Sequence, residues 1–143
     1  MPRPIRFTLL GLATAAYLVA LARLTLGAQP TEATGSLHAL ADWFAGSPVT
    51  AWVTFPVLEF AANIALFVPA GVLGVLWFGA RRWWIAVVVG FVLSAAIEAT
   101  QAMLLPDRVP DVRDLVANTA GALLGAALVA LPSRPYRPSH PHR

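Results

Sequence analysis

Residues 84–105 read WIAVVVGFVLSAAIEATQAMLL, an apolar run whose second half carries Glu98 and Gln101. At 1.5 Å per residue a helix of this length is about 33 Å long, enough to cross a hydrocarbon core of about 30 Å. A charge at the bilayer centre costs about 2.5–3.5 kcal/mol even on the most lenient insertion scale. Glu98 is therefore expected to have polar partners or a function, and this span is the first candidate location for a functional site.

Three further segments have the same character, at about 7–26, 57–78 and 114–131, and only 12% of the chain is charged. This pattern predicts an all-α, polytopic membrane protein with four transmembrane helices in one bundle, over residues 1–131. The proline-rich end, 132–143, is predicted to be a disordered cytoplasmic tail. The chain has no cysteine, which excludes disulfides and thiolate chemistry. Its arginines flank the spans and form no basic stripe, so nucleic acid is not expected as a partner.

The arginines also predict the orientation of the four spans. Seven of them fall on one side of the four crossings: Arg3, Arg6, Arg81, Arg82, Arg134, Arg137 and Arg143. Because arginine is retained on the cytoplasmic side, both termini are predicted to be cytoplasmic, in a multi-pass protein of the cell membrane. One alternative remains for the first span, which resembles a signal peptide with a cleavage site at Ala20-Leu21-Ala22. An uncleaved anchor is favoured because the apolar run is long.

The connection at 27–56 is long for a helical bundle. Within it, residues 36–46 (SLHALADWFAG) begin with Ser36 as a candidate N-cap and place Leu37, Leu40 and Phe44 on one helical face. This predicts a short helix in the outer interface or a lid over the bundle. An ordinary loop is the alternative.

Polar side chains from all four spans fall at one depth, within roughly 10 Å of the outer surface. Spacings of three and four place the polar groups of each span on one face, which predicts a polar pocket inside the bundle. Arg23 is the expected counter-ion of Glu98 or Glu59. The asparagines could instead only bridge helices, and Gly121 and Gly125 favour close helix packing. The polar residues at this depth are Arg23, Glu59, Asn63, Glu98, Gln101, Asp114 and Asn118.

Three ordered blocks of residues resemble the VanZ-like family of small integral membrane proteins. They are Asn63-x-x-x-Phe67-x-Pro69-x-Gly71, then Ser94-x-x-Ile97-Glu98-x-x-Gln101, then Arg108-x-x-Asp111-x-x-Asp114-x-x-x-Asn118-x-x-Gly121-x-x-x-Gly125. The resemblance covers about 57–131, and Arg23 is similar to an arginine of the family's first helix. It implies a four-helix membrane protein associated with glycopeptide (teicoplanin) resistance, whose relatives are suggested to act on lipid head groups.

Two functions follow as expectations. In an enzyme acting on a phosphate-containing head group, Glu98 and Asp114 are the expected acid–base residues. The expected substrate-binding residues are Arg23, Glu59, Asn63, Gln101, Arg108, Asp111 and Asn118.

The second expectation is a non-catalytic protein that binds or shields a cell-wall lipid, with membrane lipids or a lipid-linked precursor as partners. A transporter is disfavoured because the polar groups stop in the outer half. No cofactor is expected, and a divalent cation at Asp111 and Asp114 is only weakly indicated.

Overall fold

The computed structural model describes residues 3–27, 31–104 and 111–132, and this part of the chain is built from helices. Four helices are long and apolar enough to cross a membrane, which confirms the predicted all-α bundle of four spans. The helices in chain order are α1 (Arg3–Leu26), α2 (Thr31–Ala45), α3 (Phe55–Phe78), the short 3₁₀ helix η1 (Ala80–Arg82), α4 (Trp83–Leu104) and α5 (Val112–Ala130).

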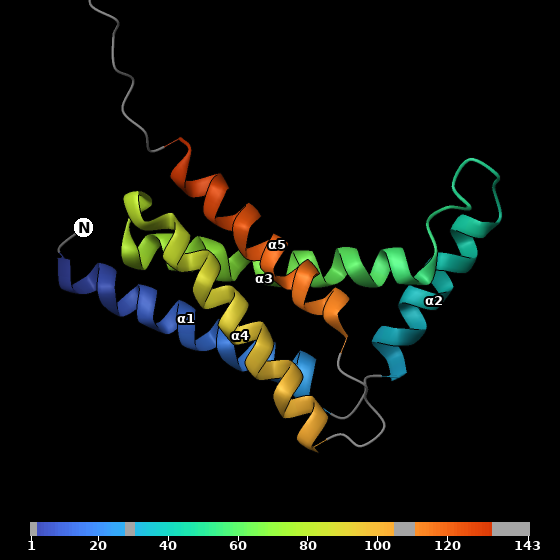
Figure 1. Ribbon diagram of the computed structural model, residues 1–143, viewed down its shortest axis with the longest axis horizontal. Helices are drawn as coiled ribbons and strands as arrows, with labels where there is room; N and C mark the ends of the chain where they lie inside the picture. The colour runs from blue at the N-terminus through green and yellow to red at the C-terminus, as the bar shows by residue number, and fades with distance from the viewer. Residues whose placement is uncertain (1–2, 28–30, 105–110, 133–143) are drawn as a thin grey trace, which may run out of the picture.

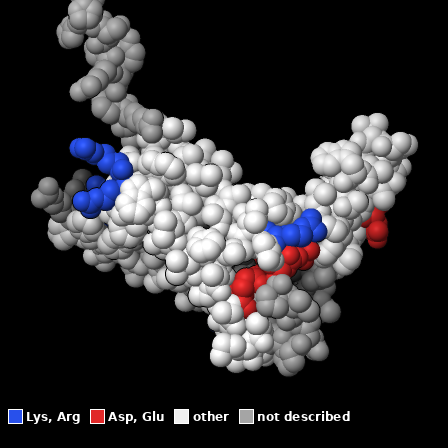
Figure 2. Space-filling view, in the orientation of Figure 1, with Lys and Arg blue, Asp and Glu red and all other residues white. Residues whose placement is uncertain are grey.

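Successive spans run in opposite directions, so the charged residues separate to the two ends of the bundle (Figure 1). The start of α1 and the turn between α3 and α4 bring Arg6, Arg81 and Arg82 to one end, here called the arginine end. The opposite end, here called the carboxylate end, carries Glu59, Glu98, Asp111 and Asp114. Figure 2 shows one basic patch at the arginine end, while the acidic atoms gather toward the other end next to a second, smaller basic patch.

Gly79 makes the tight turn at the arginine end. Its φ of 84° lies in the left-handed region that glycine adopts without strain, and its N–H donates to the Val75 carbonyl at 2.8 Å. Arg82 then donates its N–H to the Gly79 carbonyl at 3.0 Å, within η1. The chain thus reverses in a few residues, and α4 packs back along α3.

Helices α3 and α5 approach until their backbones touch. A Cβ atom at Gly121 would overlap the carbonyl oxygen of Ile64, and one at Gly125 would overlap that of Val68. Gly71 of α3 makes the reciprocal contact with the Ala122 carbonyl of α5. Small residues let membrane helices pack this closely, and the structure confirms this reading of the two α5 glycines.

The predicted helix in the first long connection exists, but it begins earlier than expected. It starts at Thr31, so Ser36 lies inside the helix and the N-cap prediction was wrong. The residues before Ser36 include Glu32 and Ala33, which favour helix and extend it by about one turn. The structure therefore excludes an ordinary loop here.

Helix α2 crosses the carboxylate end and does not run along the bundle (Figure 1). The His38 ring stacks on the Phe55 ring at the start of α3, with 4.0 Å between the ring centroids. Trp43 and Trp52, in α2 and the turns after it, are 72% and 68% exposed. These indoles suit the boundary between lipid head groups and acyl chains.

Candidate functional site

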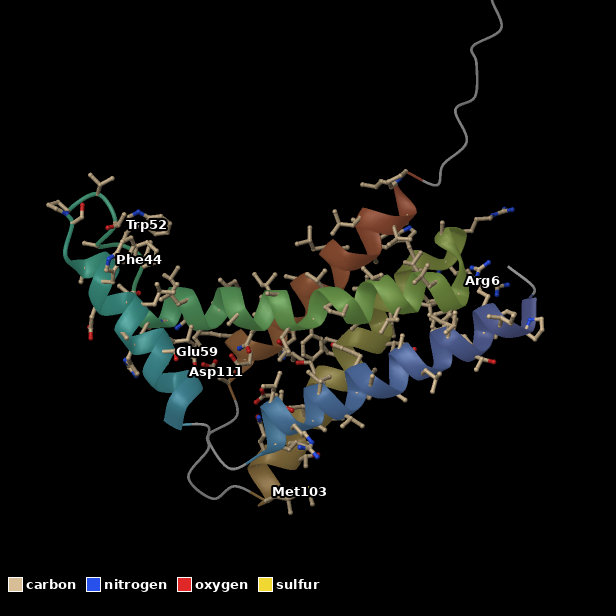
Figure 3. All side chains as sticks on the ribbon, turned by 180° about the vertical axis from the view of Figure 1, so that it is seen from behind. Arg6, Phe44, Trp52, Glu59, Met103 and Asp111 are labelled. Carbon is tan, nitrogen blue, oxygen red and sulfur yellow. The ribbon has the colours of Figure 1, made fainter. Side chains whose placement is uncertain are left out.

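Polar groups of four helices meet at the carboxylate end, and hydrogen bonds connect them. Figure 3 shows Glu59 of α3 and Asp111 at the start of α5 beside each other, far from Arg6 at the opposite end. Helices α1, α3, α4 and α5 each contribute to this polar cluster, which consists of Thr25, Glu59, Asn63, Ser94, Glu98, Gln101, Asp111, Asp114 and Asn118.

Glu98 is linked to the start of α5 through Asp111. Asp111 is the N-cap of α5, and its carboxylate accepts the Arg113 N–H at 2.8 Å. The backbone N–H of Asp111 donates to Glu98 Oε2 at 3.2 Å. The half-buried Glu98 carboxylate thus lies at the positive end of the α5 dipole, which favours a negative charge there.

Asp114, in the first turn of α5, is held by α3. Asn63 Nδ2 donates to Asp114 Oδ1 at 2.7 Å, across 51 residues of sequence. The contact depends on the close approach of α3 and α5, because both side chains are short. Both residues are half-buried, so the bond is shielded from water on part of its surface.

Asn118 lies one turn further along α5 and contacts α4. Its Nδ2 donates to Ser94 Oγ at 2.9 Å, and both side chains are buried. Asn118 is only 5% exposed, yet its Oδ1 has no hydrogen-bond partner among the described residues. A buried acceptor without a partner is uncommon, and it marks a place where a ligand or water donor would be stabilised.

Gln101 joins α4 to α1. Its Nε2 donates to the Thr25 carbonyl at 2.8 Å. That carbonyl belongs to the last turn of α1, where carbonyls lack a partner within the helix. The buried Gln101 side chain thus anchors the end of α1 at the polar cluster.

A small hollow opens between the starts of α3 and α5. Its polar lining consists of Glu59, Asp111, Arg113 and Asp114, and its volume is about 10 Å³. That is roughly the space of one water, so a lipid head group would require the two helix ends to move apart. Within the described ranges, no three His, Cys, Asp or Glu side chains gather closely enough to hold a metal ion.

Of the two arginines expected to hold a phosphate, only Arg23 lies in the part of the chain that the structure describes. Arg108 lies outside the described residues. Arg23, in the last turn of α1, is exposed, and in the part of the chain that the structure describes no ion pair joins it to a carboxylate. Its predicted pairing with Glu98 or Glu59 is therefore not formed between the described residues.

Two contributors were absent from the predicted site, namely Ser94 and the Thr25 carbonyl. Ser94 had a signal in the sequence, since it lies four residues before Glu98 on the same helical face. A backbone carbonyl at a helix end has no such signal.

The chain also matches a known protein family. A model of the VanZ/LLP1 family matches residues 14–132, which is more than half of the chain. The chain belongs to the VanZ/LLP1 family. This match includes the polar cluster, the second half of α1 and the whole of α3, α4 and α5. No curated protein and no solved structure matches the chain.

Proposed function

We propose that the polar cluster binds the phosphate-containing head group of a membrane lipid or of a lipid-linked cell-wall intermediate. The observation that carries the proposal is the convergence of acids and amides from α3, α4 and α5, joined by a backbone carbonyl of α1, at one end of the bundle. Ionisable groups inside spans are costly and usually functional. We also propose that the carboxylate end faces the outside of the cell, because arginines gather at the other end.

Charge determines how an anionic head group would bind. Among the described residues, the carboxylate end carries Glu59, Glu98, Asp111 and Asp114 but only two arginines, Arg23 and Arg113. A phosphate therefore binds best when at least one carboxyl group holds a proton and donates it in a hydrogen bond. That protonated state is also what a general acid needs.

The proposed roles follow from these contacts. Glu98 and Asp114 act as the acid and base, and Asn63, Gln101 and Asn118 orient the head group. The Asn118 Oδ1, which lacks a described partner, accepts a hydrogen bond from a hydroxyl group of the ligand. Arg23, Arg108 and Arg113 neutralise the phosphate, and Glu59 and Asp111 line the entrance.

One observation favours a second function, binding without catalysis. Both proposed catalytic acids already accept hydrogen bonds, Glu98 from the Asp111 N–H and Asp114 from Asn63. Such bonds stabilise the charged carboxylate and suit a structural role. In this alternative the same cluster binds or shields a cell-wall lipid. Either function would connect the protein to glycopeptide resistance, as the VanZ-like resemblance suggests.

Isosteric variants distinguish the two functions. Glu98→Gln keeps an acceptor for the Asp111 N–H, and Asp114→Asn keeps one for Asn63, but neither can transfer a proton. The lipids of a deletion strain are compared with those of strains carrying each variant, and Asp42→Asn in α2 serves as an exposed control outside the cluster. We expect both variants to reproduce the lipid profile and teicoplanin susceptibility of the deletion strain, and Asp42→Asn to match the wild type.

Binding without catalysis predicts the opposite result for the variants, which would then match the wild type while the deletion strain differs. If the deletion strain itself has an unchanged lipid profile, action on a lipid head group is rejected.

A further inference from the structure

An apolar groove runs between α1, α3 and α4 and belongs to none of the contacts described so far. Its larger part has a volume of about 450 Å³ and lies in the half of the bundle toward the arginine end. The walls are almost entirely apolar, and residues of all three helices form them, among them Tyr17, Leu18, Ala70, Trp77, Val89 and Leu93.

The few polar atoms in these walls already have partners. The Tyr17 hydroxyl donates to the Leu66 carbonyl at 3.1 Å, and Trp77 Nε1 donates to Thr14 Oγ1 at 3.0 Å. A void lined this way offers water almost no hydrogen bonds and stays dry. A hydrocarbon chain is therefore the kind of ligand that suits this void.

The groove continues toward the polar cluster. A second part, of about 210 Å³, shares Leu18 and Leu93 with the first and extends to Leu26, Ile97 and Thr100. These residues adjoin the Gln101–Thr25 bond that anchors the end of α1. The groove therefore ends within one helical turn of the polar cluster.

The groove is longer than one leaflet of the hydrocarbon core. From Val89 to Thr100 the groove follows α4 for 11 residue steps, or about 17 Å at 1.5 Å per step, and on α3 it reaches Trp77 and Phe78 in the last turn. Half of a hydrocarbon core of about 30 Å is about 15 Å. A single long acyl or prenyl chain that enters at the carboxylate end would thus pass the middle of the bundle to fill the groove.

We infer that this groove binds one hydrocarbon chain of a lipid and that the chain enters with its head group at the polar cluster. Loose packing of α1 makes room for it, since Leu18 is 43% exposed although it lines both parts of the groove. The chain-binding groove stands on its own geometry, whereas the identity of the head group depends on the function proposed above.

The test uses the full chain in detergent and a phosphatidic acid with a photoreactive diazirine in its acyl chain. We expect adducts on the groove-lining residues of α1, α3 and α4, and few on the exposed leucines of α5, Leu124 and Leu128. Leu18→Trp should weaken binding about tenfold, the loss expected when roughly two methylenes of the chain lose their burial.

Matched substitutions control for the added bulk. Leu12→Trp changes an exposed leucine of the same helix that does not line the groove, and it should bind like the wild type. A second pair guards against misfolding: Val89→Trp fills the groove, whereas Val92→Trp adds the same bulk to another exposed position of α4. Helicity by circular dichroism checks the fold of all four variants.

Two outcomes would overturn the proposal that the groove binds a lipid chain. One is adducts spread equally over α5 and the groove, with no difference between Leu18→Trp and Leu12→Trp. The other is a dimer that excludes the lipid, which would mean that a second copy of the chain covers the groove.

The head-group proposal is tested separately, with a phosphatidic acid carrying soluble butyryl chains. Its binding should fall in Arg113→Gln, which removes a cation proposed to neutralise the phosphate, and be unchanged in Leu18→Trp. Equal labelling by a diacylglycerol with the same photoreactive chain would support the groove and reject recognition of the phosphate.

Discussion

Helices α5 and α1 are both spans of one bundle, but they are attached to it in different ways. Helix α5 meets α3 through backbone contacts at Gly71, Gly121 and Gly125, with no room for a side chain between them. Helix α1 meets its neighbours mainly through side chains, and of its large residues whose burial the structure describes, from Pro4 on, only Leu10 and Leu21 are buried. The polar side chains that need exact placement belong largely to the tight pair, while the apolar groove lies beside the loosely packed helix.

The difference follows from the membrane environment. Lipid tails are as apolar as leucine, so burying a leucine between helices stabilises a membrane bundle little. Close backbone contact and hydrogen bonds between helices decide which pairs are tight. Hydrogen bonds attach α1 at three described positions, Tyr17–Leu66, Thr25–Gln101 and Thr14–Trp77.

The largest effect is expected when the tight interface is broken. Gly125→Val places a side chain against the Val68 carbonyl and should lower the free energy of unfolding by about 1–3 kcal/mol or more. The measurement is unfolding with sodium dodecyl sulfate in mixed micelles, followed by circular dichroism. Gly11→Val is the matched control, because a Cβ at Gly11 in α1 meets nothing within 4 Å. Equal effects of the two substitutions would refute the contrast between α5 and α1.

A smaller effect is expected at the polar link between α3 and α5. A double-mutant cycle of Asn63→Ala and Asp114→Ala should give a coupling energy of about 1 kcal/mol, since hydrogen bonds between membrane helices average about 0.6 and reach about 1.7 kcal/mol. The same unfolding assay measures it. Thr8→Ala combined with Asp114→Ala is the control cycle, because Thr8 Oγ1 donates only to the Pro4 carbonyl of its own helix. A coupling near zero for Asn63 and Asp114 would mean that their bond adds nothing to the interface.

The smallest effect is expected where α1 is attached. Thr14→Val removes the acceptor of Trp77 Nε1 and should cost about 0.6 kcal/mol. Thr8→Val is closely matched, because each threonine donates to the carbonyl four residues before it, but only Thr14 also accepts from another helix. The difference in unfolding free energy between the two variants isolates the link between α1 and α3. A difference as large as that between Gly125→Val and Gly11→Val would show that α1 is held as tightly as α5.

Much of the fold of this protein can be predicted from local sequence. The four spans end within about four residues of their predicted bounds, because an apolar run must be as long as the membrane is thick. That Glu98, Asp114 and Asn63 lie toward the same end of the bundle was also predictable, since direction and rise along a helix convert residue number into position along the bundle. The start of α2 was misjudged because one capping residue is a weaker signal than the helical preference of the residues before it.

Partners within the site could not be predicted this way. Sequence placed Arg23 as the counter-ion of Glu98 or Glu59, whereas the structure gives Glu98 the backbone N–H of Asp111 and gives Asp114 the amide of Asn63. Depth along each helix follows from its own residues, but the rotation of each helix and the distance between axes depend on contacts between segments far apart in the chain. Only tertiary packing decided which polar groups meet and where a groove remains. The glycine contacts bring α3 and α5 together, and the looser packing of α1 leaves the groove.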